Sequence, residues 1–82
     1  MTYKTHGTCS IAIHVNVNPD HTIEHVEFIG GCSGNTQGIA SLVTGMKAED
    51  AIARMEGIRC GAKPTSCPDQ LSKALKLALQ EL

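Results

Sequence analysis

The chain has 82 residues, enough for one small domain with a modest hydrophobic core. Seven basic residues nearly balance eight acidic ones, and Tyr3 and Phe28 are the only aromatic residues, so the basic face and the stacking aromatics of a nucleic-acid-binding protein are both missing. No segment has the apolar length of a membrane span and residues 1–7 lack the apolar run of a signal peptide, so we expect a cytoplasmic protein with a single domain over residues 1–82.

The first part of the chain is predicted to form an antiparallel hairpin. Residues 9–18 (CSIAIHVNVN) alternate between apolar and polar types, which predicts a half-buried strand. Its predicted inward side chains are Ile11, Ile13, Val15 and Val17. Residues 18–21 (NPDH) suit a turn, and residues 22–30 read as the returning strand. In that strand Ile23 is out of phase with the later apolar positions, which predicts a bulge or a late strand start. Residues 1–6 are a weaker candidate for a third, edge strand.

The second part of the chain has the period of α-helices. One helix is expected after Gly31, with Asn35 or Thr36 as its cap and Gly45 as its stop. A short helix is expected to end at Gly57. The apolar positions that define these two helices are Ile39, Leu42, Val43, Met46, Ala48, Ala51, Ile52 and Met55. The face of a C-terminal helix is marked by Leu71, Ala74, Leu75, Ala78 and Leu82. The order of elements predicts an α+β fold, in which a small antiparallel sheet of two or three strands is followed by, and packed against, three helices.

The start of the last helix carries a cysteine in a distinctive setting. Ser66 and Asp69 have the spacing of a capping box, and Pro68 suits the first turn because the missing N–H costs nothing there. Cys67 is therefore predicted to lie among the first residues of the helix, where unpaired N–H groups and the helix dipole favour a thiolate. A thiolate is the form of cysteine that binds metals and attacks disulfides.

Four cysteines are predicted to gather at one end of the sheet. Cys9 begins the first long strand and Cys32 follows the second, so an antiparallel hairpin brings them together. Cys60 lies in the loop that leads to Cys67. In a reducing compartment such cysteines indicate metal binding, redox chemistry or buried packing rather than disulfides. Packing alone explains any one of them, because free cysteine is often buried, but it explains all four less well.

The histidines and the glycine-rich stretch carry weaker signals. His6 is a candidate auxiliary ligand or a surface residue, and His14 and His25 read as an exposed pair on the polar side of the hairpin. His21 is expected to be a solvated turn residue. Asp69 is interpreted as a cap in preference to a ligand. The stretch GCSGNTQG at residues 31–38 lacks the ending of a phosphate-binding P-loop, which leaves nucleotide binding a weak alternative.

The chain resembles the TSCPD domain family over almost its full length. The stretches that carry the resemblance are GTCS at residues 7–10, GGCSGNTQGI at 30–39, GIRCG at 57–61 and TSCPDQL at 65–71. The resemblance implies either a short stand-alone protein or the C-terminal part of a cobalamin-dependent ribonucleotide reductase, and stand-alone members often carry a ribonucleoside-diphosphate reductase label. At 82 residues the chain is too short for a complete reductase, so the resemblance implies an accessory module.

A looser resemblance is to U-type iron–sulfur cluster scaffold proteins. They are similar in placing one cysteine before a long strand, one after the hairpin and one at the start of a late helix, which Cys9, Cys32 and Cys67 match. Two positions depart from that pattern: Ile11 replaces the scaffold's Asp, and Ser66 replaces its His. Cys60 is additional. The resemblance implies a similar fold and site geometry, without implying cluster assembly.

Three functions follow from these observations. The first is a metal-binding module, in which zinc or an iron–sulfur cluster is held by Cys9, Cys32, Cys60 and Cys67. The second is a dithiol carrier whose Cys60 and Cys67 cycle to feed electrons to a reductase. The third is a structural or interaction domain with inert thiols. The expected partner is a ribonucleotide reductase or another redox protein, and a second copy of the chain is a further candidate because a core this small often needs a subunit's support. Whether the module catalyses any reaction is left open.

Overall fold

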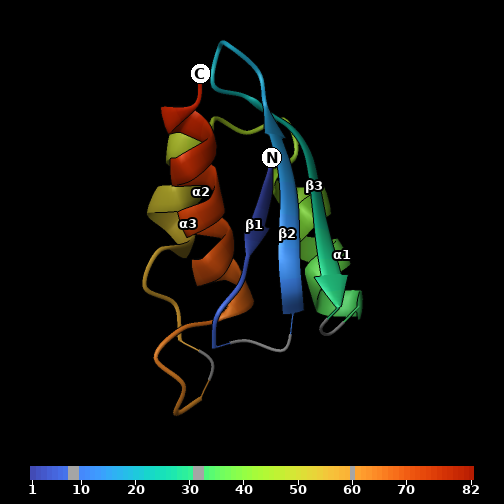
Figure 1. Ribbon diagram of the computed structural model, residues 1–82, viewed down its shortest axis with the longest axis vertical. Helices are drawn as coiled ribbons and strands as arrows, with labels where there is room; N and C mark the ends of the chain where they lie inside the picture. The colour runs from blue at the N-terminus through green and yellow to red at the C-terminus, as the bar shows by residue number, and fades with distance from the viewer. Residues whose placement is uncertain (8–9, 31–32, 60) are drawn as a thin grey trace.

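The computed structural model is an α+β domain that contains a three-stranded antiparallel sheet (Figure 1). The residues it describes are 1–7, 10–30, 33–59 and 61–82. Strands β1 (Thr2–Lys4), β2 (Ser10–Val17) and β3 (Ile23–Gly30) lie in the order β1-β2-β3. Both neighbouring pairs are antiparallel. The predicted hairpin and the predicted N-terminal edge strand are therefore confirmed.

Three helices follow the sheet, as the sequence predicted. They are α1 (Ser33–Val43), α2 (Ala48–Met55) and α3 (Cys67–Gln80). Gly45 and Gly57, which follow the first two helices, have φ of 91° and 86°. That left-handed conformation is easy for glycine and ends a helix, so both predicted stops are confirmed.

Two irregularities shape the hairpin between β2 and β3. One register shift, between Ser10 and Ala12, leaves Ile11 outside the alternation. Ile11 is 66% exposed, whereas Ile13 and Val15 are fully buried. The prediction that Ile11 points into the core is wrong, because a bulge turns the extra residue away from the regular pleat. The other shift, between Asn16 and Val17, lies opposite the start of β3 and confirms the predicted bulge there.

Helix α1 differs from its prediction in its start and in its buried face. It begins before Asn35, and Thr36 is buried within the helix, so neither residue is its cap. Val43 is buried but Leu42 is 78% exposed. The helix packs against β3, and its buried residues Thr36 and Val43 are seven positions apart and so lie on one face, whereas Leu42 lies about 100° around the axis from Val43. Leu42 was therefore wrongly assigned to the core.

One hydrophobic core joins the sheet to all three helices. Side chains of β2 and β3 that point to one face of the sheet meet the buried faces of the helices in a single cluster. Its members are Ile13, Val15, Ile23, Val26, Val43, Ala48, Ala51, Met55, Leu71, Ala74, Leu75 and Ala78. Helix α3 packs against β2 and α2, and α1 packs against β3. The predicted inner face of the last helix is confirmed except at Leu82, which lies beyond the end of α3 and is exposed.

A helix that crosses a bilayer must be both long and apolar. Within the described parts of the chain, no helix combines enough length with enough apolar character to be a membrane span.

Candidate cysteine site at the start of helix α3

Several chain segments reach the end of the molecule where α3 begins. The end of β1, the start of β2, the end of β3 and the loop that precedes α3 all lie toward the lower end in Figure 1. Ser10 pairs with Gly30 in the β2–β3 register, which brings the start of one strand beside the end of the other. The fold thus places the segments that flank the four cysteines at one end of the sheet.

Cys67 is the first residue of α3, as predicted. Ser66 is the N-cap, and its Oγ accepts a hydrogen bond of 3.2 Å from the backbone N–H of Asp69. Pro68 lies in the first turn, where it displaces no hydrogen bond. The Cys67 side chain is 8% exposed. Cys67 therefore lies at the buried start of a helix.

The carboxylate of Asp69 holds the loop of residues 57–65 against this helix start. Its Oδ1 accepts a hydrogen bond of 2.7 Å from the backbone N–H of Gly57, and its Oδ2 accepts one from the hydroxyl of Thr65. The Thr65 bond first, and then the Gly57 bond and the Lys73 ammonium, hold the pKa of Asp69 below its usual value despite burial. The capping residue contributes as well, because Ser66 Oγ donates to the carbonyl of Ile58 at 2.6 Å.

Gln70 connects the β1–β2 loop to the same helix turn. Its Oε1 accepts a hydrogen bond of 3.0 Å from the backbone N–H of His6, and its Nε2 donates to Thr65 Oγ1 at 3.0 Å. Gly7, with φ of 76°, lies so close to Thr65 that a Cβ at position 7 would be 2.9 Å from the threonine Cγ2. Two loops are therefore fixed to the first turn of α3 by its own polar side chains.

Sequence reasoning missed the bridging roles of Gln70 and of the Asp69 carboxylate. Both side chains are almost completely buried, whereas the sequence predicted a capping role for Asp69, with metal ligation as the alternative, and no role for Gln70. The sequence does contain a signal for these bridging roles, because four polar residues of TSCPDQ surround one cysteine immediately before an apolar helix face. Polar side chains so close to a core need hydrogen-bond partners, and neighbouring loops are the available source.

The structure leaves the predicted four-cysteine cluster untested. Cys9, Cys32 and Cys60 lie outside the described residues, and Cys67 is within them. In sequence, the first three directly adjoin Ser10, Ser33 and Arg59, which are described. Within the described ranges, no group of three or more His, Cys, Asp or Glu side chains is placed to hold a metal. A metal site formed by Cys9, Cys32, Cys60 and Cys67 stays a prediction.

The histidines lie away from Cys67 or contribute only their backbone to its surroundings. His6 is exposed, and its backbone N–H makes the bond to Gln70 described above. His14 and His25 have ring centroids 6.3 Å apart; His25 is exposed and His14 half-buried. His21, in the turn after β2, is hydrogen-bonded through its Nδ1 to the carboxylate of Glu49 in α2. That hydrogen bond ties the far turn of the hairpin to α2.

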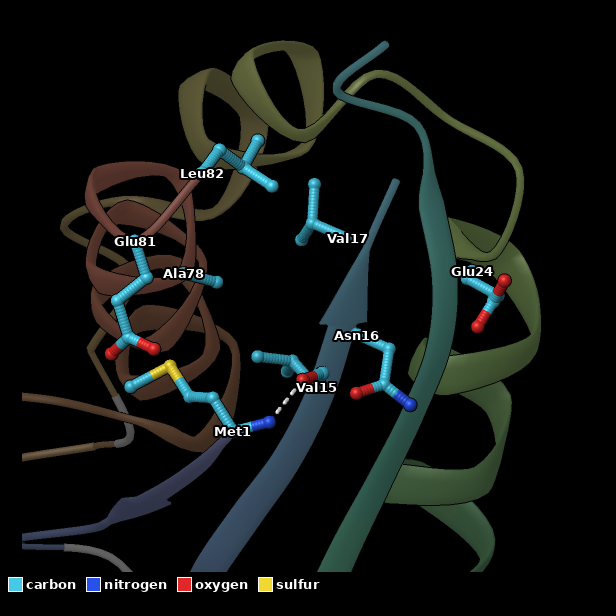
Figure 2. Close-up of a pocket in the computed structure, with 8 residues that line it drawn as sticks. All are labelled: Met1, Val15, Asn16, Val17, Glu24, Ala78, Glu81 and Leu82. Atoms are coloured by element: carbon cyan, nitrogen blue, oxygen red, sulfur yellow. Dashed lines mark hydrogen bonds between the residues drawn. The ribbon is translucent and has the colours of Figure 1, made fainter. Parts of the chain in front are cut away.

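A cavity of about 500 Å³ lies at the other end of α3 (Figure 2). Its lining residues are Met1, Val15, Asn16, Val17, Glu24, Ala78, Glu81 and Leu82. Figure 2 shows the ammonium group of Met1 within this cavity, where it donates a hydrogen bond of 3.0 Å to the carbonyl of Val15. None of the described cysteine or histidine residues lines the cavity, and Cys67 lies at the opposite end of the helix.

Comparison with known families identifies the chain. The family model of the TSCPD domain matches residues 1–79. The chain belongs to the TSCPD domain family. No curated protein and no solved structure gives a significant match. The comparisons therefore add nothing to the resemblance to U-type iron–sulfur scaffold proteins, which stays a prediction.

Proposed function

We propose that this TSCPD domain is a small metal-binding module, in which the sulfurs of Cys9, Cys32, Cys60 and Cys67 together hold one zinc ion or one iron–sulfur cluster. The observation that carries the proposal is the anchoring of two loops to the first turn of α3. His6 and Gly57 both donate backbone hydrogen bonds to side chains of that turn. Cys9 follows His6 by three residues, and Cys60 follows Gly57 by three residues.

The chemistry of this donor set suits a closed metal site. Four thiolates are the ligands of many structural zinc sites and of iron–sulfur clusters. The low exposure of Cys67 supports a ligand more than a redox dithiol, because a cycling thiol must be reached by a partner's sulfur. A bound metal would hold the sulfurs together without exposing them.

We further propose that the module assists a ribonucleotide reductase. Family membership supports this accessory role, since TSCPD domains resemble the C-terminal part of such enzymes. The chain has 82 residues, and its described parts form a three-stranded sheet and three helices; a reductase's catalytic barrel needs a much longer chain. Its contribution would be to bind the enzyme or to present a metal or a dithiol to it.

The test compares two neighbouring substitutions in protein purified without chelator. Cys67→Ser removes a sulfur and keeps a residue that a helix start tolerates. Ser66→Ala removes the N-cap, at a cost of about 1 kcal/mol, and keeps every sulfur. We expect Cys67→Ser to lose most of the bound metal and Ser66→Ala to keep it. Elemental analysis and the absorbance spectrum measure both and identify the metal.

Two results would contradict the proposal. If Cys67→Ser retained the full metal content of the unmodified protein, Cys67 would be a packing residue. If the unmodified protein held no metal and two of its thiols became protected under mild oxidation, the dithiol carrier would replace the metal module.

A further inference from the structure

A second cavity, of about 350 Å³, lies between α3 and the loop that precedes it. Its lining residues are Glu56, Gly57, Arg59, Pro64, Asp69, Ser72, Lys73 and Lys76. This volume is at the lower end of the range of small-molecule pockets, which is about 300–1,000 Å³. The cavity is large enough for a small metabolite or for one end of a larger one.

The charges around this cavity favour an anion. Three of the lining side chains are basic and two are acidic. The carboxylate of Asp69 is 6% exposed, and its oxygens already accept hydrogen bonds from Gly57 and Thr65. Lys73 is 3.9 Å from that carboxylate and half exposed, which leaves its ammonium group able to bind a further anion.

Arg59 and Lys76 complete the basic side of the cavity. Lys76 is paired with Glu56, but both side chains are about half exposed, and such surface pairs contribute little and exchange readily. The guanidinium of Arg59 has no ion pair or hydrogen bond with any other described residue. A guanidinium is the side chain best suited to a two-point hydrogen bond with a phosphate or a carboxylate.

We propose that this cavity binds the oxyanion group of a small molecule, a phosphate or a carboxylate, through Arg59, Lys73 and Lys76. The loop that supplies Arg59 and the helix that supplies both lysines are held together by the Asp69 and Ser66 hydrogen bonds, so the backbone positions that carry the three cations are fixed relative to one another. None of the three is a proposed metal ligand. The proposal goes beyond the metal-binding function and does not depend on it.

An NMR titration of the purified chain tests the proposal. The probes are inorganic phosphate and, separately, succinate, with ionic strength held constant by chloride. We expect saturable shifts of the Gly57, Arg59 and Lys73 amides with at least one probe. A response to phosphate alone identifies phosphate compounds as the ligand class, and a response to succinate alone identifies carboxylates.

Three substitutions that remove one positive charge each provide the decisive comparison. Arg59→Gln and Lys73→Gln should weaken binding of the responding probe about tenfold or more, the usual effect of losing a charge-assisted hydrogen bond. Lys63→Gln is the matched control, because Lys63 is exposed in the same loop but does not line the cavity. It should change the affinity less than twofold. Thermal melts and metal content of each variant confirm that fold and metal are unchanged.

Three outcomes would overturn the proposal. One is that neither probe produces saturable shifts at these amides. The second is that Lys63→Gln weakens binding as much as Arg59→Gln, since that would show attraction by net charge alone. The third is that the affinity for the probe varies with the metal content of the samples and is unchanged by Arg59→Gln, since that would show that the probe binds at the metal.

Discussion

The residues around Cys67 fix the surrounding loops through buried polar contacts. Thr65 donates to Asp69 and accepts from Gln70, and the latter two side chains also bind the backbone of separate loops. Among described side chains, no buried nitrogen or oxygen lacks a hydrogen-bond partner. Because an unpaired buried polar group costs about 1–3 kcal/mol, each member of this network depends on the others.

Gln70→Ala should release the β1–β2 loop. The change leaves the His6 N–H without its acceptor and the Thr65 hydroxyl without one donor, so we expect a loss of about 1–3 kcal/mol in the free energy of unfolding. Hydrogen exchange at the His6 amide should accelerate. Gln80→Ala, at the exposed end of the same helix, is the control and should leave that amide protected. Equal exchange rates in the two variants would disprove the bridging role.

Asp69 should make stability depend on acidity. The folded-state pKa of Asp69 is lowered, chiefly by the Thr65 hydrogen bond. The ionised carboxylate therefore contributes fully to the free energy of unfolding above the unfolded pKa of about 4, and this contribution is lost as pH falls through the lower folded pKa. Asp69→Asn should therefore flatten the decline of stability in that acid range. Thr65→Val, which removes one donor, should flatten it partly. Urea denaturation at a series of pH values measures both, and an unchanged slope in Asp69→Asn would contradict the assignment.

At the scale of the elements, α3 connects the sheet to the helical part of the fold. Its inner face packs against β2 and α2, and its first turn holds the loops described above. Leu71, Ala74 and Leu75 on that face are fully buried. The same helix therefore contributes to the core and positions the candidate site, so packing faults in α3 should affect both.

Substitution of two leucines in α3 distinguishes the effect of burial on stability from the effect of helix propensity. Leu75 is fully buried and Leu77 is 39% exposed. Leu75→Ala should lower the free energy of unfolding by about 2–5 kcal/mol, because it leaves a cavity in the core. Leu77→Ala makes the same chemical change at the surface and should cost less than about 1 kcal/mol. Urea unfolding measures both; comparable losses would show that α3 is packed differently.

The sequence predicted the elements better than their faces. Strong periodicity was sufficient for β2, β3, α2 and α3, and the cap at Ser66 was found because its chemistry is local. Ile11 and Leu42 were misassigned because the bulge in β2 and the choice of the buried face of α1 are set by tertiary packing, which the apolar spacing does not encode. For the site, the position of Cys67 was predictable. The bonds of Asp69 and Gln70 were not, because their partners lie in loops distant in sequence.

At the scale of the whole molecule, the domain is small and its core is built mostly from aliphatic residues and alanine. A domain of this size buries little more apolar surface than is needed to offset the entropy of ordering its chain. A metal that links the sheet to the start of α3 would add stability that the core alone lacks. Structural zinc can contribute on the order of 10 kcal/mol in small peptides.

A strong chelator should therefore lower the melting temperature of the metal-bound protein. Even about 1 kcal/mol corresponds to roughly 4–8 °C for a domain of this size. Reductant alone should leave the melt unchanged, because metal-bound thiolates need no disulfide. Thermal melts with chelator, with reductant and with neither make the comparison. A drop in reductant alone would indicate a stabilising disulfide.

The most direct measurement is the amount of metal bound per chain, determined on protein purified without chelator together with a count of accessible thiols. The metal-module account predicts one zinc ion or one iron–sulfur cluster per chain. It also predicts that Cys9, Cys32, Cys60 and Cys67 are protected from thiol reagents until a chelator removes the metal. Protein that is folded, free of metal and reactive at all four thiols would contradict it.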